Sequence, residues 1–351
     1  MLDTAPPRTA APPRRRPPVP PPAAPTTLRA TTTYRHGRPL RRRARRGRGL
    51  LGLALAAAVG VGWVTTDSAG HLPALLDGGP AVESPSSPPP AVAWPGQGQA
   101  AYTTSAIDGI RTSGDAAPQP IASVTKLMTA YVVLHERPLQ PGETGPAYPV
   151  TAADVADTER RRAAGESVVP VATGQDLTEL QALQALLLPS ANNVAVILAR
   201  ETAGSVEEFV GWMNDAADDL GMDDTEYADP AGMADGSMST AADQVLLLDA
   251  AMADPVLAAV LGAASADVPV AGTVTTTDAL LGQHGVVAGK TGSHDAAGGC
   301  FAFRAVLQVD GQPVTVTGVV LGQRGGPFIA AALSAAEALL VSVADSSDVR
   351  A

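Results

Sequence analysis

The sequence predicts a mixed α/β domain of the α+β type, in which one antiparallel sheet is flanked by helices and interrupted by an all-α insertion. Strand-like runs occur near the start of the body, at residues 99–105 and 109–113, and again near its end, at residues 299–309 and 313–321. Between these runs, residues 151–265 carry apolar side chains mostly at helical spacing. We therefore expect strands from both ends of the domain to share one sheet.

Charge is divided unevenly along the 351-residue chain, whose formal net charge is −11. Residues 1–50 hold 13 arginines and one acid, Asp3, so the remainder is strongly acidic. Nucleic acid would require a basic face, and we expect no such partner. The single cysteine, Cys300, excludes an intramolecular disulfide, and the five scattered histidines form no metal-binding motif. We therefore expect no metal and no cofactor. The bias toward Ala, Gly and Arg, with few aromatic residues, indicates a high-GC genome.

Three segments precede the body of the chain. Residues 1–48 are rich in Pro and Arg, cannot form a core, and are expected to be a disordered cytoplasmic tail. Residues 49–66 are uncharged and apolar, and as a helix they would extend about 27 Å, close to the roughly 30 Å of a bilayer core. The arginines before this segment place the body outside the cytoplasm. Residues 67–93 are rich in Pro, Ser and Gly and are expected to form a semi-rigid linker.

The apolar segment 49–66 admits two interpretations. As an uncleaved, single-pass signal anchor it would end beside Trp63, an aromatic residue suited to the membrane interface. As a signal peptide it would be cleaved near Asp67-Ser68-Ala69, although an n-region of nearly fifty residues is long for such a peptide. We favour the anchor, which places the chain in the cell membrane, and keep a cleaved, secreted form as the alternative.

The body extends over residues 94–343, and its elements follow in a clear order. After the first hairpin, Pro118 and Pro120 break the chain just before a helix predicted over Ser123–Leu134. Helix starts are predicted at Thr151 and Thr178. Helical stripes are expected over residues 177–187, 194–203, 206–220 and 241–253. Near the end, Asp310-Gly311 is a hairpin turn signal between two strands, and residues 327–342 form a closing helix.

Ser123 and Lys126 lie three residues apart, on one face of the first predicted helix. All 24 basic residues are arginines except Lys126 and Lys290. Arginine does not lose its proton in proteins, whereas lysine does when it is buried or lies near another cation. In a chain that uses arginine for nearly every positive charge, a lysine that served only as a surface charge would be unusual. We therefore expect Lys126 to be neutral and to accept the proton of Ser123. Taken alone, however, S-x-x-K is a common pattern.

Ser190 and Asn192 follow Pro189 between two predicted helices, where a short loop could direct both side chains into a cleft. Ser and Asn are also preferred helix N-caps, and taken alone this motif fits a cap at least as well.

The other lysine lies in the stretch Lys290-Thr291-Gly292-Ser293, at the edge of a predicted strand. A lysine that is not buried keeps its charge and suits a carboxylate ligand. Glycines on both sides would let a substrate backbone approach the strand closely. The alternative is an ordinary surface lysine, which the scarcity of lysine in this chain disfavours.

Together, S-x-x-K, S-x-N and K-T-G, in this order, resemble the motif set of penicillin-binding proteins and serine β-lactamases. The body as a whole is similar to the D-alanyl-D-alanine carboxypeptidases, which are low-molecular-mass penicillin-binding proteins. The stretches that carry this resemblance are IASVTKLMTA at 121–130, LPSANN at 188–193, FVGWMN at 209–214, LGM at 220–222, DPAGM at 229–233 and STAAD at 239–243.

The resemblance implies a β-lactamase/transpeptidase-like fold and an acyl-transfer hydrolase that removes the terminal D-alanine from peptidoglycan stem peptides. Ser123 would attack the peptide carbonyl, Lys126 would take its proton, and Ser190 would relay a proton to the leaving amine. Asn192 would bind the acyl chain of the substrate. β-Lactams would trap the acyl-enzyme. The set implied to bind the terminal carboxylate and the oxyanion is Lys290, Thr291, Gly292 and Ser293, together with the backbone N–H of Ser123.

The chain departs from the family pattern at several positions. Asn193 replaces the acid that often follows S-x-N, Met233 replaces a leucine, and residues 275–278 occupy a place where asparagines are common. Cys300 follows K-T-G and is expected to be a small buried apolar residue.

Three other functions share the same scaffold. A transpeptidase would use every one of these residues. A class A β-lactamase would need a carboxylate for the deacylating water, and Glu159 and Glu166 lack the E-x-x-x-N setting of that class. An inert wall-binding or β-lactam-sensing protein is disfavoured by the intact motifs.

Overall fold

A computed structural model describes residues 91–350. The expectations for residues 1–48 and 49–66, and for most of the linker 67–93, lie outside these residues. The described part begins just before the body predicted from the sequence.

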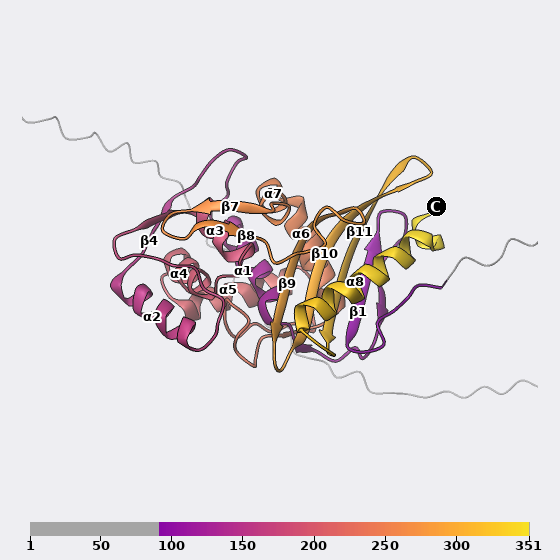
Figure 1. The fold of residues 1–351 in the computed structure, drawn as a ribbon, viewed down its shortest axis with the longest axis horizontal. Coiled ribbons are helices and arrows are strands. Elements are labelled where there is room, and N and C mark those ends of the chain that lie inside the picture. Colours follow the sequence, from indigo (N-terminus) through magenta and orange to yellow (C-terminus); the bar gives the residue numbers. More distant parts are fainter. Residues whose placement is uncertain (1–90, 351) are drawn as a thin grey trace, which may run out of the picture. The chain divides into compact units, whose positions relative to one another are not determined.

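A five-stranded antiparallel sheet holds strands from both ends of the body, as predicted (Figure 1). The strand order is β2-β1-β11-β10-β9, so the first strands of the chain pair directly with the last one. β9 forms one edge of this sheet. The strands are β1 (Gln99–Thr104), β2 (Arg111–Ser113), β9 (Val286–His294), β10 (Gly298–Val309) and β11 (Gln312–Gln323).

The hairpin between β10 and β11 has the predicted turn. Val309 pairs with Gln312, which leaves Asp310 and Gly311 as a two-residue loop. Their φ angles are 51° and 78°. A tight turn with both central residues in the left-handed region matches the twist of the flanking strands, and Asp-Gly is a favoured pair for it.

Helices make up most of the insertion between the two groups of strands, and two of their starts are capping boxes. At Thr151 and Thr178 the threonine side chain accepts a hydrogen bond from the backbone of the third helical residue, whose own side chain bonds back. The helices are α1 (Lys126–Glu136), α2 (Ala152–Ala163), α3 (Glu179–Leu187), α4 (Asn192–Ala203), α5 (Val206–Asp219), α6 (Ala241–Ala253) and α7 (Pro255–Leu261). All except α7 begin within a few residues of a predicted start.

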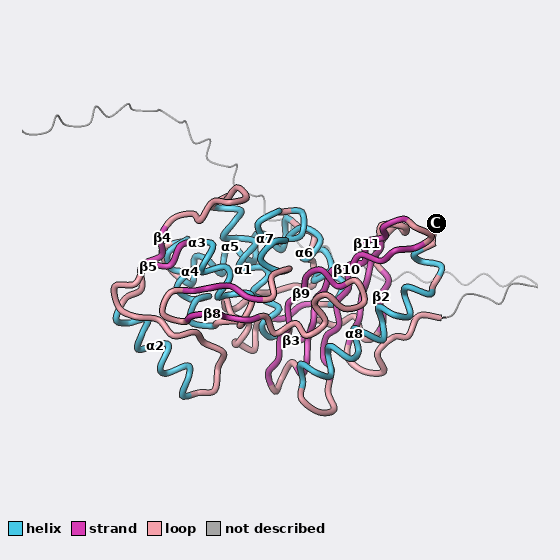
Figure 2. The backbone as a smooth tube through the Cα atoms, turned by 45° about the horizontal axis from the view of Figure 1, so that its top comes forward, coloured by secondary structure: helices cyan, strands magenta, loops and turns pink. Residues whose placement is uncertain are grey.

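Three short two-stranded pairs, β3–β6, β4–β5 and β7–β8, lie apart from the main sheet and were not predicted (Figure 2). Their strands are two to four residues long, too short for an alternating pattern to stand out from the sequence. They are β3 (Gln119–Pro120), β4 (Ala147–Pro149), β5 (Asp176–Thr178), β6 (Met238–Ser239), β7 (Ser265–Val268) and β8 (Gly272–Thr275).

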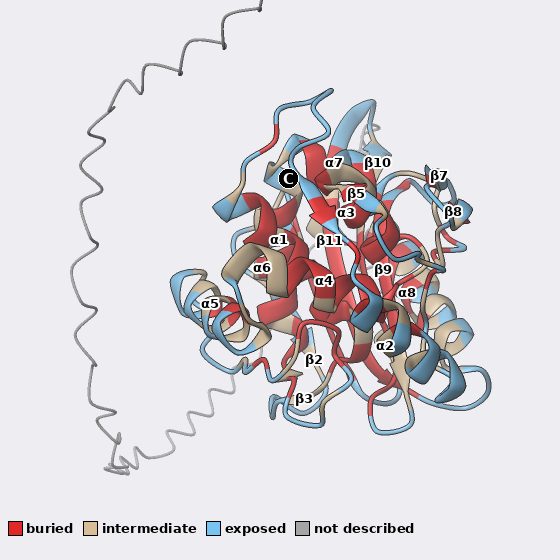
Figure 3. Cartoon of the chain, turned by 90° about the vertical axis from the view of Figure 1, so that its left-hand side faces the viewer, coloured by how far each residue is buried: buried red, intermediate tan, exposed pale blue. Residues whose placement is uncertain are grey.

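The domain is layered. The closing helix α8 (Phe328–Asp345) crosses one face of the sheet, while α6 packs against β1 and β11 (Figure 1). The helical part has its own core with α4 at its centre, where seven of the twelve α4 residues are buried and none is exposed (Figure 3). This arrangement places the start of α4, the start of α1 and the edge strand β9 where the two parts of the domain meet.

Of the described helices, only α8 is by itself long and apolar enough to span a membrane, with a mean hydropathy of 1.7. Its inner face is part of the core beneath the sheet, because Ala332, Ala336, Leu339, Leu340 and Val343 are buried there. The apolar character of α8 is therefore explained, at least on this face, by packing within the domain.

Candidate active site

The three sequence motifs meet at the junction between helices and sheet. Ser123 lies in a short 3-10 helix, Ala122–Thr125, that leads directly into α1, so Lys126 is the first residue of the α-helix. Lys126 Nζ lies 2.7 Å from Ser123 Oγ and 2.6 Å from Asn192 Oδ1. Lys290 Nζ donates to Ser190 Oγ at 3.0 Å. The fold therefore links all three motifs by hydrogen bonds.

Lys126 is completely buried, and its surroundings suit a neutral amine. A neutral amine has two N–H donors and one lone pair. Asn192 Oδ1 and the carbonyl oxygen of Ala231, at 2.9 Å, can take the two donors, which leaves the lone pair for the hydroxyl proton of Ser123. Burial, reinforced by the positive charge of Lys290, holds the pKa of Lys126 well below its ordinary value. The geometry accommodates a neutral amine, and the charge environment favours a lysine that accepts a proton.

The loop 229–234 supplies one of these acceptors, the carbonyl oxygen of Ala231. Because this acceptor is a backbone atom, the side chains of the loop do not indicate its role. Asp229 accepts hydrogen bonds from four consecutive backbone N–H groups, those of residues 231–234, and so fixes the loop. Gly232 has a φ of 77°, and a Cβ atom there would overlap the carbonyl oxygen of Ala122. Glycine at this position lets the loop pack tightly against the residue before Ser123.

Two non-glycine residues of the site have left-handed backbones. Ala122 has a φ of 48° and Ser190 a φ of 64°. Such conformations are uncommon outside glycine and concentrate at functional sites. They turn the chain immediately before Ser123 and at Ser190 itself.

The N-cap interpretation of the second motif is wrong. The cap residue of α4 is Ala191, and no side chain accepts a capping bond. Asn192 is instead the first residue of the helix, and its side chain contacts Lys126 and Glu166. Ser190 is equally engaged, since its hydroxyl accepts a bond from Lys290.

The premise that Lys290 is not buried is also wrong, because the residue is only 1% exposed. Its ammonium group donates to Ser190 Oγ and, at 2.6 Å, to the carbonyl oxygen of Thr291. Burial lowers the pKa of Lys290 to about 7, while the neighbouring Asp278 carboxylate opposes this shift. Its charge therefore depends on its neighbours and not on exposure to water.

The remaining residues of the third motif form the wall of the site along β9. Thr291 Oγ1 lies 2.5 Å from Thr277 Oγ1, which ties the segment before β9 to the strand. A Cβ atom on Gly292 would lie 2.8 Å from the backbone nitrogens of both Ser123 and Val124. Glycine thus lets β9 approach the backbone of Ser123 closely. Ser293 follows on the same strand and is partly buried.

Asn193, which departs from the acid of the family pattern, has a structural explanation. Its amide donates to Thr158 Oγ1 at 3.0 Å and to the carbonyl oxygen of Val169 at 2.9 Å, while its Oδ1 accepts from the Val169 backbone at 3.2 Å. An ionised aspartate has no donor and could not bond the Val169 carbonyl oxygen, and it could bond Thr158 only if that hydroxyl gave up its bond to the Asp154 carbonyl oxygen. Asn193 therefore fastens the loop after α2 to the buried helix α4.

Cys300 is completely buried, as predicted for a small apolar residue. Burial raises the pKa of its thiol to about 12, so it is not a thiolate at neutral pH.

The two glutamates considered for a deacylating base lie in different settings. Glu159 pairs with Arg162 on the exposed side of α2. Glu166 Oε2 instead accepts a hydrogen bond from Asn192 Nδ2 at 2.8 Å, and this contact was not predicted. Only the folded loop 164–168 brings Glu166 to the site, because it lies 26 residues from Asn192 in sequence.

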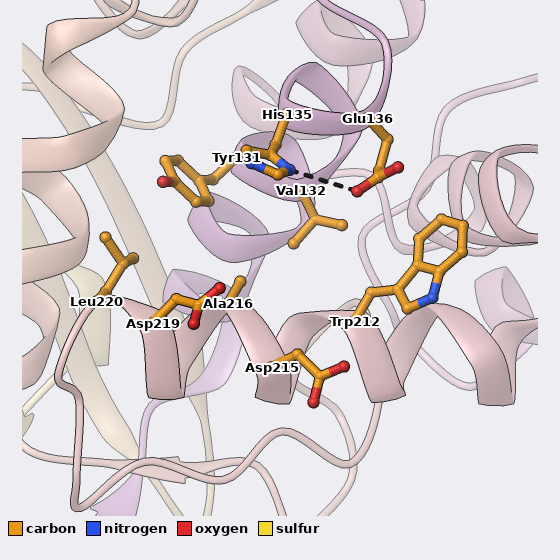
Figure 4. A pocket seen from close by; sticks show the side chains of 9 residues that line it. All are labelled: Tyr131, Val132, His135, Glu136, Trp212, Asp215, Ala216, Asp219 and Leu220. Atoms are coloured by element: carbon orange, nitrogen blue, oxygen red, sulfur yellow. Dashed lines mark hydrogen bonds and ion pairs between the residues drawn. The ribbon is translucent and has the colours of Figure 1, made fainter. Parts of the chain in front are cut away.

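A separate hollow of about 240 Å³ lies between α1 and α5. Figure 4 shows aromatic and acidic side chains around it, including Tyr131, His135, Trp212 and Asp215. None of the residues that carry the three motifs lines it. Within residues 91–350, no group of three or more His, Cys, Asp or Glu side chains is placed to hold a metal ion.

A Ser–Lys pair with a buried lysine, joined by hydrogen bonds to a Ser-x-Asn loop and lying beside a Lys-Thr-Gly strand, is the residue arrangement of the penicillin-recognising serine enzymes. The chain belongs to the D-alanyl-D-alanine carboxypeptidase family, whose sequence profile matches residues 110–325.

Individual relatives agree with this assignment. A D-alanyl-D-alanine carboxypeptidase of Mycobacterium tuberculosis is 36% identical over 186 residues, covering 51% of this chain and 59% of the relative. A D-alanyl-D-alanine endopeptidase of Escherichia coli is 29% identical over 197 residues, covering 54% of this chain and 60% of the relative. The chain thus spans less than two thirds of the length of these relatives.

Solved structures show the same fold. The Streptomyces K15 DD-transpeptidase superimposes with a TM-score of 0.61 at 25% identity, covering 72% of this chain and 98% of that one. A D-alanyl-D-alanine carboxypeptidase from M. tuberculosis gives a TM-score of 0.60 at 25% identity, with coverages of 74% and 94%. The predicted β-lactamase/transpeptidase-like fold is therefore confirmed.

Proposed function

We propose that the chain removes the terminal D-alanine from peptidoglycan stem peptides that end in D-Ala-D-Ala, through an acyl-enzyme on Ser123. The observation that carries this proposal is the position of Lys126 Nζ, buried and within 2.7 Å of Ser123 Oγ. A serine hydroxyl needs a base to become a nucleophile, and a neutral lysine is such a base.

In the acylation step, Ser123 Oγ forms a bond to the carbonyl carbon between the two D-alanines while its proton passes to Lys126. The C–N bond then breaks, and Ser190 relays a proton to the nitrogen of the leaving D-alanine. The contact between Ser190 and Lys290 supports this role, because an ammonium donor beside the hydroxyl eases release of its proton. Asn192 binds the acyl chain with the amide hydrogen that Glu166 does not take.

The third motif would hold the two negative groups of the reaction. Lys290 and Thr291 bind the terminal carboxylate of the substrate. The backbone N–H groups of Ser123 and Ser293 form the oxyanion hole, and each donor of this kind contributes about 3 kcal/mol to transition-state stabilisation. The close approach of Gly292 to the backbone of Ser123 supports this pairing of strand and nucleophile.

Water completes the cycle by attacking the ester of the acyl-enzyme, which releases the shortened peptide and restores the Ser123 hydroxyl. A β-lactam would acylate Ser123 in the same way, but its ring-opened product stays attached and blocks the water. Penicillin is therefore expected to act as a covalent inhibitor.

We further propose that residues 49–66 anchor the chain in the cell membrane with residues 94–343 outside the cytoplasm. The apolar run, the arginines before it and the Pro-rich segment after it support this placement. A peptidoglycan substrate outside the membrane is consistent with it.

The direct test is the release of D-alanine from a diacyl-tripeptide ending in D-Ala-D-Ala, measured with the full-length chain in detergent. We expect release by the wild-type chain, none by Ser123→Ala, and inhibition by penicillin. A wild-type chain that binds penicillin without releasing D-alanine would instead indicate a sensor. Rapid hydrolysis of the penicillin would indicate a β-lactamase.

A further inference from the structure

A continuous chain of hydrogen bonds extends from the surface helix α2 to the nucleophile. Arg161 Nη1 donates to Glu166 Oε2 at 2.8 Å, and Asn192 Nδ2 donates to the same oxygen at 2.8 Å. Asn192 Oδ1 then accepts from Lys126, which lies against Ser123. We propose that Glu166 is a positioning residue that orients the Asn192 carboxamide, and through it the amine of Lys126, for acylation.

The Asn192 amide has one favourable orientation in this chain of bonds. As placed, its N–H donor faces a carboxylate and its oxygen faces the amine of Lys126. A flip would bring the oxygen of Asn192 against the carboxylate and its N–H₂ group against the N–H donors of Lys126. Glu166 therefore selects the orientation that gives Lys126 an acceptor.

Glu166 is itself held on several sides. Arg161 is anchored by a bond from its Nε to Asp157 Oδ2 at 2.6 Å. The backbone of the loop is pinned next to Glu166, because the Asn192 N–H donates to the Ser167 carbonyl oxygen at 2.8 Å. The side chains of Arg161 and Glu166 are only 19% and 18% exposed. A partly buried carboxylate that accepts two hydrogen bonds is suited to fix the orientation of the Asn192 amide.

The negative charge of Glu166 has a second effect that separates it from a neutral acceptor. It favours the protonated form of Lys126 and so opposes the lowering of the lysine pKa by burial. Replacement by glutamine would preserve an oxygen acceptor for Asn192 but remove the charge. The orientation and the charge can therefore be tested separately.

A competing role is general base for the deacylating water. The geometry disfavours it, since Glu166 Oε2 already accepts two hydrogen bonds and one donor is an arginine. This role predicts a selective loss of deacylation and is distinguished by the test below.

The experiment uses full-length Glu166→Ala and Glu166→Gln, with Glu159→Gln as the matched control on the exposed side of the same region. Acylation and deacylation rates are measured separately with a chromogenic β-lactam. We expect Glu166→Ala to acylate about 10- to 100-fold more slowly, the effect of losing a hydrogen bond to a charged group. Glu166→Gln should remain within about threefold of the wild type at its pH optimum, and Glu159→Gln should be unchanged.

A second readout does not depend on activity. Because the chain has only two lysines, ¹³C-labelled lysine gives two resonances whose titration can be followed by NMR. Glu166→Gln should lower the pH at which Lys126 titrates, leave Lys290 unchanged, and move the acidic limb of the acylation profile to lower pH. Glu159→Gln should move neither lysine.

The inference depends on the proposed roles of Lys126 and Asn192. The experiments distinguish a failure of the role of Glu166 from a failure of the proposed function. A Glu166→Ala chain that acylates within twofold of the wild type, or that loses deacylation alone, would overturn the inference. So would an unchanged Lys126 titration in Glu166→Gln. Absence of any acylation in the wild-type chain would instead refute the proposed function, while the lysine titration would still decide whether Glu166 acts on Lys126.

Discussion

The two lysines of this chain lie in the same site but in different settings. Lys126 begins a helix, and its amine contacts the side-chain oxygen of Asn192, the hydroxyl of Ser123 and the backbone carbonyl oxygen of Ala231. Lys290 lies on an edge strand, bonded to Ser190 and to a backbone carbonyl, with the Asp278 carboxylate nearby. Both are buried, and burial lowers the pKa of both.

The difference shows that burial alone does not assign a lysine its role. Two buried ammonium groups repel each other, so one of them loses its proton more readily. The positive charge of Lys290 lowers the pKa of Lys126, whereas Asp278 favours the charged form of Lys290. We infer that Lys126 is the base and Lys290 the carboxylate-binding cation, although both are hidden from water.

The largest expected effect is that of Lys126→Arg. An arginine keeps the charge but cannot accept the Ser123 proton, so acylation by penicillin should fall about 1,000-fold or more. The rate of adduct formation, followed by mass spectrometry of the intact protein, measures it. The same substitution at Lys290 is the matched control and should retain far more acylation, because there the charge is what matters. Equal losses at the two positions would remove the distinction between the lysines.

The next effect is that of Lys290→Met, which removes the cation but preserves much of the side-chain volume. Loss of a charged hydrogen bond to the substrate carboxylate should reduce kcat/KM for D-alanine release about 100-fold. A β-lactam ester without a free carboxylate should be far less affected. If the ester and the acid lose equally, Lys290 does not bind the carboxylate.

Gly232→Ala should disturb the surroundings of Lys126, which contacts the neighbouring Ala231 carbonyl oxygen, and leave those of Lys290 unchanged. The added Cβ would overlap the carbonyl oxygen of Ala122, and the backbone has a positive φ. We expect a loss of about 1–3 kcal/mol in the free energy of unfolding, together with slower acylation. Thermal unfolding and the lysine titration measure this. A shift of Lys290 in place of Lys126 would contradict the assignment of the loop to Lys126.

The smallest effect expected is that of Asp278→Asn. Asp278 is buried and raises the pKa of Lys290, so the variant should let Lys290 lose its proton at lower pH. The basic limb of kcat/KM should move to lower pH, with a roughly two- to fivefold loss just above neutrality. Asp267→Asn, an exposed carboxylate of β7, is the control and should leave the profile in place. A basic limb that moves to higher pH would reverse the account of Asp278.

Much of the site could be predicted because its chemistry depends on side chains, which can be read directly from the sequence. The scarcity of lysine singled out Lys126 and Lys290, and the order of three motifs placed Ser190 and Asn192 beside them. The alternation of strands and helices likewise predicted the sheet and most helices.

Other features depend on tertiary structure and left no comparable signal. The acceptor at Ala231 is a backbone carbonyl, and the contact of Glu166 with Asn192 exists only once the loop after α2 is folded. The burial of Lys290 was missed because a lysine between glycines looks exposed in sequence. The short strands outside the main sheet pair over too few residues to show a period.

We expect the lysine beside Ser123 to be neutral at the pH at which acylation proceeds, while Lys290 keeps its proton more readily. This difference can be measured directly in the full-length chain with ¹³C-labelled lysine, since only two resonances are expected. Assignment follows from Lys290→Met, in which only the Lys126 resonance remains. We expect Lys126 to titrate far below the ordinary lysine range and Lys290 to titrate near pH 7. A Lys126 that stays charged up to about pH 10, the range of an unperturbed lysine, would contradict this expectation.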